Sequence, residues 1–312
     1  MQTKKLSNYI KRFAKYPILI LCIYYLGVNA TKISPDQFKP SFIWLVLIFG
    51  PLYFLSTFLR AINWQTGLGL LEKVKRKYRD IARIHFKTAI AKYVPSNVMH
   101  YAGRHFMGSQ IGIDHATILT SNLLDLTLAM LSAGIIVLCA LSTNLIEIPQ
   151  TLQKHYDKYN LPCLAIVCIC IMIFFCFIWR KTKSRSQNKN ISILPQLLSI
   201  VVIYLIFFTA SGTVFFLIFV GTGNADPNIK ALLYFIAVYV CGWALGFITP
   251  GAPGGIGVRE SIMVAMLSGT IDPQAALVGA LLFRLVTIFG EFLGFIFAST
   301  LLKPPSVLED QC

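Results

Sequence analysis

Long apolar runs separate short polar connections through most of this 312-residue chain, and they constrain its fold more than any other feature. Several of these runs exceed the roughly 18 apolar residues that mark a membrane-spanning helix. Only 13% of the residues are charged, whereas charged residues make up about a quarter of a typical soluble domain. The sequence therefore predicts an all-α, multi-pass transmembrane bundle and excludes a water-soluble globular protein.

About seven full spans are expected, together with one or two broken or re-entrant helices. The segments that fit a full span lie near 16–31, 41–60, 116–141, 161–179, 193–221, 231–249 and 274–301. No soluble domain fits between these segments, so residues 1–312 are expected to form a single integral-membrane domain.

The formal net charge of +15 is concentrated in connections that are expected to face the cytoplasm. Basic residues gather in the N-terminal segment 1–15 and in the connections 73–87 and 180–189. Few lysines and arginines occur in the intervening connections near 31–40, 142–160 and 221–229. Because basic residues in short loops stay on the cytoplasmic side, we predict a cytoplasmic N-terminus in the cell (cytoplasmic or inner) membrane. Topology and anionic lipid headgroups account for the basic tracts, so no nucleic-acid partner is expected.

Two segments fit no full span and are expected to form paired broken elements at 81–113 and 250–269. Residues 81–113 carry too many charges to cross lipid alone. The apolar stretch 257–269 makes only roughly 20 Å of helix, against a hydrocarbon core of roughly 30 Å. The sequences VPSNVMHYAGR (94–104) and TPGAPGGIGVR (249–259) both run from a proline to an arginine. Paired breaks of this kind are a sequence indicator of a transporter's binding site.

The sides of the membrane reached by the two broken segments follow from the span count. Four predicted spans lie between the segments, so both are expected on the same side, as paired motifs without inversion. Segment 250–269 is expected to enter and leave from the cytoplasmic side, because backbone rich in proline and glycine cannot face lipid. The last helix would then end outside.

Glycines in the second broken segment are expected to let backbone N–H groups approach an anion. Gly254, Gly255 and Gly257 precede a helix whose first turn carries Arg259 and Glu260. Glycine permits a close backbone approach, and a helix N-terminus adds partial positive charge. The segment does not match a nucleotide-binding loop. The alternative interpretation is a simple tight turn between two helices.

Three ionisable residues, Asp125, Arg284 and Glu291, lie inside predicted spans. At about 1.5 Å per residue, Asp125 and Arg284 come near mid-depth, where a charge costs at least roughly 2.5–3.5 kcal/mol. They must therefore face the bundle interior and find partners or water. One interpretation is a structural ion pair, with Arg284 bonded to Glu291 or Asp125, and the other is a functional site.

Catalytic and metal-binding patterns are not found in the sequence. It contains no HExxH, no GxSxG and no CxxC pair, and the spacing of His100, His105 and His115 matches no metal site. We expect a transporter-like protein more than an enzyme, with no catalytic residue, no metal and no cofactor. The chain has no nucleotide-binding domain, so ATP is not expected to be its own energy source.

The two broken segments resemble motifs of the lysylphosphatidylglycerol synthetase/flippase transmembrane family. The more specific motif is P-G-G-x-G-x-R-E, matched here by residues 253–260. The first family motif often reads K-Y-x-P-G-K, and here Ser96 and Asn97 replace its glycine and second lysine. Members are implicated in moving lipids with charged or glycosylated headgroups, including aminoacylated phospholipids and polyprenyl-phosphate-linked sugars.

This resemblance implies a flippase-like translocase for a phosphate-containing lipid held within the bilayer. Arg104, Arg259 and Arg284 are expected to meet the phosphate or headgroup, near Gly254, Gly255 and Gly257, and His100 is expected among the substrate-binding residues. Glu260, Glu291 and Asp125 are expected to balance these arginines or to bind a cationic headgroup. The alternatives are an integral-membrane transferase acting on lipid-linked sugar, with Glu260 or His100 as acid or base, and a non-transporting scaffold of envelope polysaccharide assembly. Envelope-biosynthesis enzymes are candidate partners, and the oligomeric state is not predicted.

Overall fold

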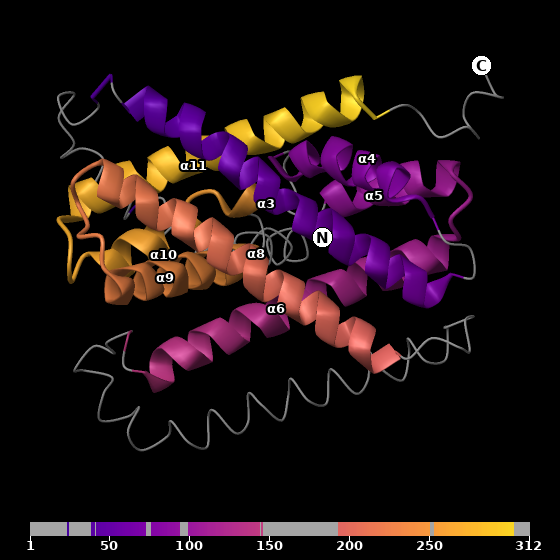
Figure 1. Cartoon of the computed structure of the whole chain (residues 1–312), viewed down its shortest axis with the longest axis horizontal. Helices are drawn as coiled ribbons and strands as arrows, with labels where there is room; N and C mark the ends of the chain where they lie inside the picture. The colour runs from indigo at the N-terminus through magenta and orange to yellow at the C-terminus, as the bar shows by residue number, and fades with distance from the viewer. Residues whose placement is uncertain are drawn as a thin grey trace, which may run out of the picture.

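The computed structural model describes residues 24, 39–40, 42–72, 76–93, 99–143, 145, 193–249 and 253–302. Within these residues the chain is all-helical and contains no strand, which confirms the predicted fold class. The predicted spans 16–31 and 161–179 lie outside the described residues, apart from Tyr24. Figure 1 shows long helices crossing one another in a single bundle.

Five of the described helices are long and apolar enough to cross a membrane: α3 (Phe42–Leu71), α6 (His115–Ser142), α8 (Ile193–Gly221), α9 (Ile229–Ile248) and α11 (Pro273–Thr300). Their ends lie within about two residues of the predicted spans, except that α3 continues to Leu71 where the predicted span ended at residue 60. Large apolar side chains such as Leu47, Leu198 and Leu285 point away from the bundle. Such an apolar exterior suits lipid, and the chain is a multi-pass membrane protein.

Polar side chains at the ends of connections determine where several of these helices begin. Asp114 accepts a hydrogen bond from the backbone N–H of Thr117 at 3.1 Å, and α6 starts at the next residue. Asn228 accepts one from the N–H of Ala231 at 2.8 Å and caps α9 in the same way. A capping side chain satisfies an N–H group that has no partner within the helix.

Helix α8 runs antiparallel to α3. Leu45, near the start of α3, packs against Gly221 at the end of α8. Asn63, near the end of α3, donates a hydrogen bond to the carbonyl of Ile200 at 3.3 Å, near the start of α8. The end of α3 and the start of α8 therefore lie at one end of the bundle, which also carries the basic residues Arg76 and Lys77. We call it the basic end.

Helix α11 runs parallel to α3, so it ends at the basic end. Gly50 lies against Gly290, and the ring of Phe58 lies 5.5 Å from that of Phe297 between centroids. The last helix was expected to end on the side opposite the basic connections. That prediction is wrong, because α11 ends at the basic end. Residues 303–312 lie outside the described residues.

A first helical hairpin enters the bundle from the basic end. It consists of α4 (Tyr78–Ala89), the short helix η2 (Ile90–Tyr93) and α5 (Met99–Gln110). Gly103 of α5 packs closely on Thr88 of α4. Arg76, before α4, donates a hydrogen bond to the carbonyl of Ile111, just after α5, at 2.8 Å. These contacts show that α5 runs back beside α4 to the end from which α4 came.

A second helical hairpin enters from the opposite end. It consists of α9, the short helix η3 (Pro253–Gly255) and α10 (Val258–Leu267). Gly246, near the end of α9, packs against Arg259 at the start of α10. The hydroxyl of Tyr234, near the start of α9, donates to the carbonyl of Met266 at the end of α10. Helix α10 thus returns beside α9 to the end where α9 began.

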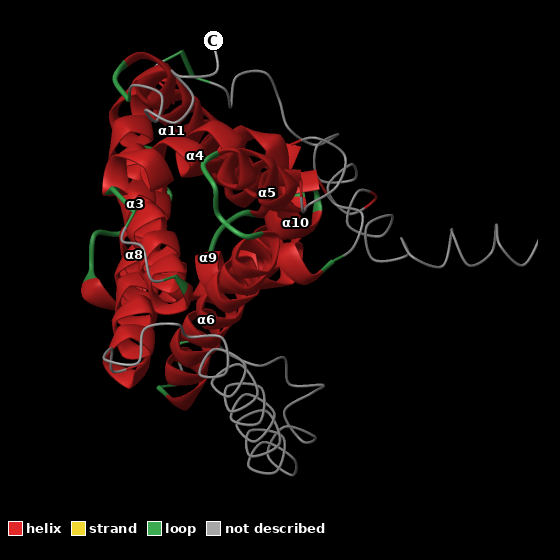
Figure 2. Cartoon of the chain, turned by 90° about the vertical axis from the view of Figure 1, so that its right-hand side faces the viewer, coloured by secondary structure: helices red, strands yellow, loops and turns green. Residues whose placement is uncertain are grey.

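The tips of the two hairpins meet inside the bundle. A Cβ atom on Gly254 would lie 3.3 Å from the ring of Tyr93 and 3.5 Å from the carbonyl oxygen of Lys92. In Figure 1, α4 and α5 lie at the right and α9 and α10 at the left, and Figure 2 shows α3, α8 and α11 across from α5, α9 and α10.

The paired broken segments therefore approach each other from opposite ends, and the prediction that both lie on the same side is wrong. Its error lies in the treatment of α9. That helix is the first arm of the second hairpin, not a separate crossing between the two motifs. Only three of the predicted spans remain between the two hairpins. Because each span carries the chain to the other side of the membrane, an odd number of spans places the two hairpins in inverted orientation.

Candidate functional site

The first group of buried charges joins the first hairpin to α6 and α8. Arg104 Nη1 donates to Asp125 Oδ2 at 2.9 Å, and the Tyr204 hydroxyl donates to the other carboxylate oxygen. The guanidinium carbon of Arg104 also lies 4.8 Å from the centre of the Trp64 ring. Arg104 is only 1% exposed, so this ion pair is closed off from any ligand that does not displace a partner.

His85 of α4, which is not one of the spanning helices, is a second hydrogen-bond partner of Arg104. Its Nδ1 lies 2.6 Å from Arg104 Nη2. Burial, together with the charge of Arg104, holds the pKa of His85 well below its ordinary value. A guanidinium has no lone pair to offer, so Nδ1 must accept and the neutral ring carries its proton on Nε2. The imidazole therefore adds no positive charge to this group.

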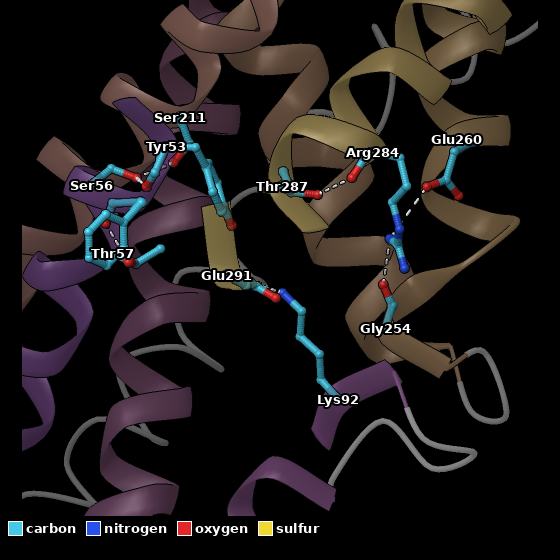
Figure 3. A network of polar contacts seen from close by, with 11 residues as sticks. Tyr53, Ser56, Thr57, Lys92, Ser211, Gly254, Glu260, Arg284, Thr287 and Glu291 are labelled. Carbon is cyan, nitrogen blue, oxygen red and sulfur yellow. Dashed lines mark hydrogen bonds and ion pairs between the residues drawn. The ribbon is translucent and has the colours of Figure 1, made fainter. Parts of the chain in front are cut away.

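The second group of charges fastens the tip of the second hairpin to α11. Arg284 Nη1 donates to the carbonyl of Gly254 at 3.0 Å and to Glu260 Oε1 at 3.4 Å. Glu260 Oε2 accepts the backbone N–H of Gly257 at 2.8 Å. Figure 3 shows Arg284 reaching from α11 to both partners. Glu260 is thus both the cap of α10 and the counterion of Arg284.

The third group links the tip of the first hairpin to α11. Lys92 of η2 donates to Glu291 Oε1, and Figure 3 shows the lysine chain extended toward that carboxylate. Glu291 is 3% exposed. Burial lowers the pKa of the Lys92 amine to about 8, and the nearby Glu291 carboxylate opposes that shift. The two hairpins are therefore each held to α11 by an ion pair that is largely shielded from solvent.

Two arginines in this region have no acidic partner. None of the described carboxylates forms an ion pair with Arg259 or Arg60. Arg259 is 7% exposed, and its Nε and Nη2 atoms have no hydrogen-bond partner. Its guanidinium carbon lies 5.0 Å from the centre of the Tyr239 ring and 5.3 Å from that of Phe283. Aromatic faces offset part of the burial of a cation but accept none of its hydrogen bonds in the guanidinium plane.

Both arginines line one cavity of about 60 Å³ between the two hairpins. A single water needs roughly 10–15 Å³ on this measure, so the space suits several waters or a group of comparable size. No carboxylate belongs to its lining. The lining residues are Arg60, Lys92, His100, Tyr101, Leu126, Ala129, Tyr204, Trp243, Gly246, Phe247, Gly254, Gly255 and Arg259.

The glycines of the second hairpin adopt backbone angles that other residues rarely adopt. Their φ angles are +57° at Gly254, +72° at Gly255 and +85° at Gly257. This left-handed backbone turns the chain between α9 and α10 and brings Gly254 and Gly255 to the cavity wall. Gly257 does not offer its N–H to the cavity, because Glu260 accepts it. The expected open N–H groups are therefore absent at this position.

The structure separates the predicted site residues into two sets. His100, Gly254, Gly255 and Arg259 line the cavity. The others surround it as ion pairs or caps: Arg104 with Asp125, Arg284 with Glu260, Glu291 with Lys92, and Gly257 at the start of α10. The predicted presence of partners for the intramembrane charges is confirmed.

The predicted partners themselves are different. Arg284 pairs with Glu260, whereas Glu291 or Asp125 was expected, and Glu260 forms no ion pair with the neighbouring Arg259. The reason lies in helix α10, whose first turn needs the Glu260 carboxylate as a cap and so holds it beside α11.

Arg60 and Lys92 are cavity residues that the sequence reading missed. Arg60 stood at the predicted end of a span, where a basic residue is ordinary, yet α3 carries it into the bundle. The apolar sequence that continues after Arg60 was the feature that could have predicted its position inside the bundle. Lys92 directly precedes Tyr93 in the first broken motif, which offered a signal through the K-Y-x-P pattern.

Comparison with known proteins identifies one family. A family model described as "Lysylphosphatidylglycerol synthase TM region" matches residues 12–294. That range includes both hairpins and every residue that lines the cavity. A comparison with curated proteins gives no match.

Proposed function

The chain belongs to the family of the lysylphosphatidylglycerol synthase TM region, and from this premise we propose that it moves a phosphate-containing lipid across the cell membrane. The observation that carries the proposal is Arg259, a buried arginine without an acid partner on the wall of a cavity that Arg60 also lines. Family membership makes the chain a lipid-related membrane protein, and the cavity supplies the place where a headgroup is held.

An anionic ligand resolves the energetic difficulty of the two arginines. An unpaired charge at the bilayer centre costs at least roughly 2.5–3.5 kcal/mol. Phosphate oxygens accept two parallel hydrogen bonds from a guanidinium, which is the geometry that arginine offers and lysine does not. The Nε and Nη2 atoms of Arg259 are buried and have no acceptor among the described residues. A phosphate placed there supplies both the missing charge and the missing acceptors.

The two hairpins reach this site from opposite ends of the bundle. We place the basic end at the cytoplasm, together with the N-terminus, because basic connections stay inside. The first hairpin is then re-entrant from the cytoplasm and the second from the outside. Irregular backbone at membrane depth is tolerated where it is buried in protein or lines a cavity. Paired broken helices that meet at a central site are the arrangement of many transporters.

The bonding of Glu260 argues against one candidate acid or base of a transferase reaction. A transferase would use Glu260 or His100 as its acid or base. Both carboxylate oxygens of Glu260 are already bonded, one to Arg284 and one to the N–H of Gly257. His100 lines the cavity, where it is placed to contact a headgroup. Moving a lipid requires binding and release at this cavity and no bond-breaking residue.

Arg259→Lys in reconstituted vesicles tests the proposal. Purified protein is placed in vesicles with a fluorescent anionic phospholipid, and the lipid reaching the other leaflet is followed by quenching from one side. We expect the variant to retain its folded yield and to lose most of the transport, because lysine keeps the charge without the fork. The matched control is Arg79→Lys, at an exposed residue of α4.

Two results would count against the proposal. If Arg259→Lys transports normally, the arginine is not the phosphate ligand. If transport falls only in proportion to the folded yield, the segment is a structural turn and the assignment of a phosphate site is refuted.

A further inference from the structure

The charged groups around the cavity do not balance one another. Five are basic and three are acidic: Arg60, Lys92, Arg104, Arg259 and Arg284 against Asp125, Glu260 and Glu291. Three ion pairs neutralise six of these groups. The remaining two are Arg60 and Arg259, so this described region carries a net charge of two positive.

The acids near the cavity are committed to their own partners. Asp125 is bonded through both oxygens, to Arg104 and Tyr204. Glu260 is bonded through both oxygens as well. Glu291 has one oxygen without a partner, yet it lies outside the cavity wall. No described carboxylate is therefore placed to receive an ammonium group from a ligand.

An amino group in the cavity would instead meet like charges. Arg60, Lys92 and Arg259 line the wall, and a headgroup amine brought among them would be repelled and would find no acid. Like charges that are brought together in this way disfavour binding. A lipid whose headgroup carries a free amine is therefore expected to bind poorly in this cavity.

We propose that the group held in the cavity carries two negative charges on phosphate oxygens and no amine, as in a lipid with a terminal phosphate or a diphosphate linkage. This inference rests on the proposed function and narrows its substrate class. Two negative charges would balance Arg60 and Arg259, the two cavity arginines without an acid partner among the described residues. A phosphodiester lipid such as phosphatidylglycerol supplies one charge, and an aminoacylated phospholipid supplies one together with at least one opposing positive charge.

Binding of three lipids with the same acyl chains tests the proposal. The full-length protein, in nanodiscs of phosphatidylcholine, is titrated with phosphatidic acid, phosphatidylglycerol and lysyl-phosphatidylglycerol. A terminal phosphate carries about −1.5 to −2 charges near neutral pH. We expect phosphatidic acid to bind at least about tenfold more tightly than phosphatidylglycerol, a difference of about 1.4 kcal/mol. Lysyl-phosphatidylglycerol should bind most weakly.

Arg60→Gln is the informative variant. It removes one of the two unpaired charges and breaks no ion pair. The preference for phosphatidic acid over phosphatidylglycerol should fall from about tenfold to about onefold. Arg79→Gln, at the exposed arginine of α4, should leave the preference unchanged. If Arg60→Gln does not fold, the ranking of the three lipids on the native protein still decides the question.

Inorganic pyrophosphate separates a lipid headgroup from a soluble anion. It should compete with phosphatidic acid only at much higher concentration, because it lacks the acyl chains. Equal affinity for pyrophosphate would overturn the assignment to a lipid. Equal or tighter binding of lysyl-phosphatidylglycerol would overturn the charge assignment.

The inference and the proposed function fail in different ways. If the lipids rank as expected but none moves between leaflets in vesicles, translocation is refuted and the charge preference stands. If all three lipids bind equally and move at equal rates, the charge preference is refuted and translocation stands.

Discussion

Arg104 and Arg259 are both buried and both lie over aromatic rings, yet their hydrogen bonds are completed in different ways. Arg104 donates to Asp125 and His85. Arg259 has two donor nitrogens without partners. A structural arginine needs its partners inside the protein, whereas a ligand-binding arginine must keep donors available. We therefore assign Arg104 to the stability of the bundle and Arg259 to the site.

Arg104→Ala should destabilise the protein strongly, because it leaves Asp125 charged and buried without its partner. Removing one member of a buried ion pair costs about 3–5 kcal/mol. The melting temperature of the detergent-solubilised protein should fall, and Arg259→Ala should lower it much less. The double variant Arg104→Met with Asp125→Leu should recover most of the loss, since a buried pair can be replaced by apolar residues. A double variant no better than Arg104→Ala would argue against a purely structural pair.

The hairpin is the next larger unit, and glycine packing holds each one closed. Gly103 lies on Thr88 in the first hairpin, and Gly246 lies on Arg259 in the second. A Cβ atom on Gly103 would come 2.9 Å from Thr88 Cγ2, and one on Gly246 would come 3.2 Å from Arg259 Cβ. Each hairpin thus depends on the absence of a side chain where its two arms meet.

Gly246→Ala should lower transport, because the added methyl group pushes Arg259 away from the cavity. The matched control is Gly69→Ala in α3, where a Cβ atom would meet nothing within 4 Å. That control gains roughly 1 kcal/mol of helix preference at no steric cost. Initial transport rates per folded protein give the comparison. Equal rates in the two variants would mean that the contact between Gly246 and Arg259 does not position the arginine.

The sequence predicted elements better than it predicted contacts. Apolar length alone located α6, α8, α9 and α11. It ended α3 too early, because Arg60 and Asn63 look like the border of a membrane, while in the fold Asn63 bonds the carbonyl of Ile200. The partners of the buried ion pairs could not be predicted from the sequence. Lys92 and Glu291 are separated by 199 positions, and only the meeting of the first hairpin with α11 brings them together.

At the scale of the whole molecule, the parallel course of α3 and α11 makes a prediction about topology. Cysteines introduced at Leu301 and Lys77, in a cysteine-free background, should be labelled from the cytoplasmic side. A cysteine at Asp226, in the connection between α8 and α9, should be labelled from outside. All three positions are exposed. Labelling of Leu301 and Asp226 from the same side would contradict the arrangement of the second hairpin.

The membrane potential acts on the molecule as a whole and gives an expected direction of transport. With the cell interior negative, moving one negative charge outward gains roughly 2.3 kcal/mol per 100 mV. Outward movement of an anionic lipid therefore needs no other energy source. We expect collapse of a potassium-diffusion potential in vesicles to slow outward movement. A transport rate that does not depend on the membrane potential would show that no net charge crosses the membrane in the rate-limiting step.

The two unpaired arginines also bear on what the protein must keep out. A protein that opens a polar path through a bilayer risks leaking protons and metal ions, which would dissipate the gradients of the cell. Fixed positive charge at the narrowest part of a pathway repels such cations. Arg60 and Arg259, which lie on the wall of the cavity, would then insulate the membrane whenever the site is empty. Vesicles carrying the native protein should hold a proton gradient, and vesicles carrying Arg60→Gln with Arg259→Gln should lose it faster.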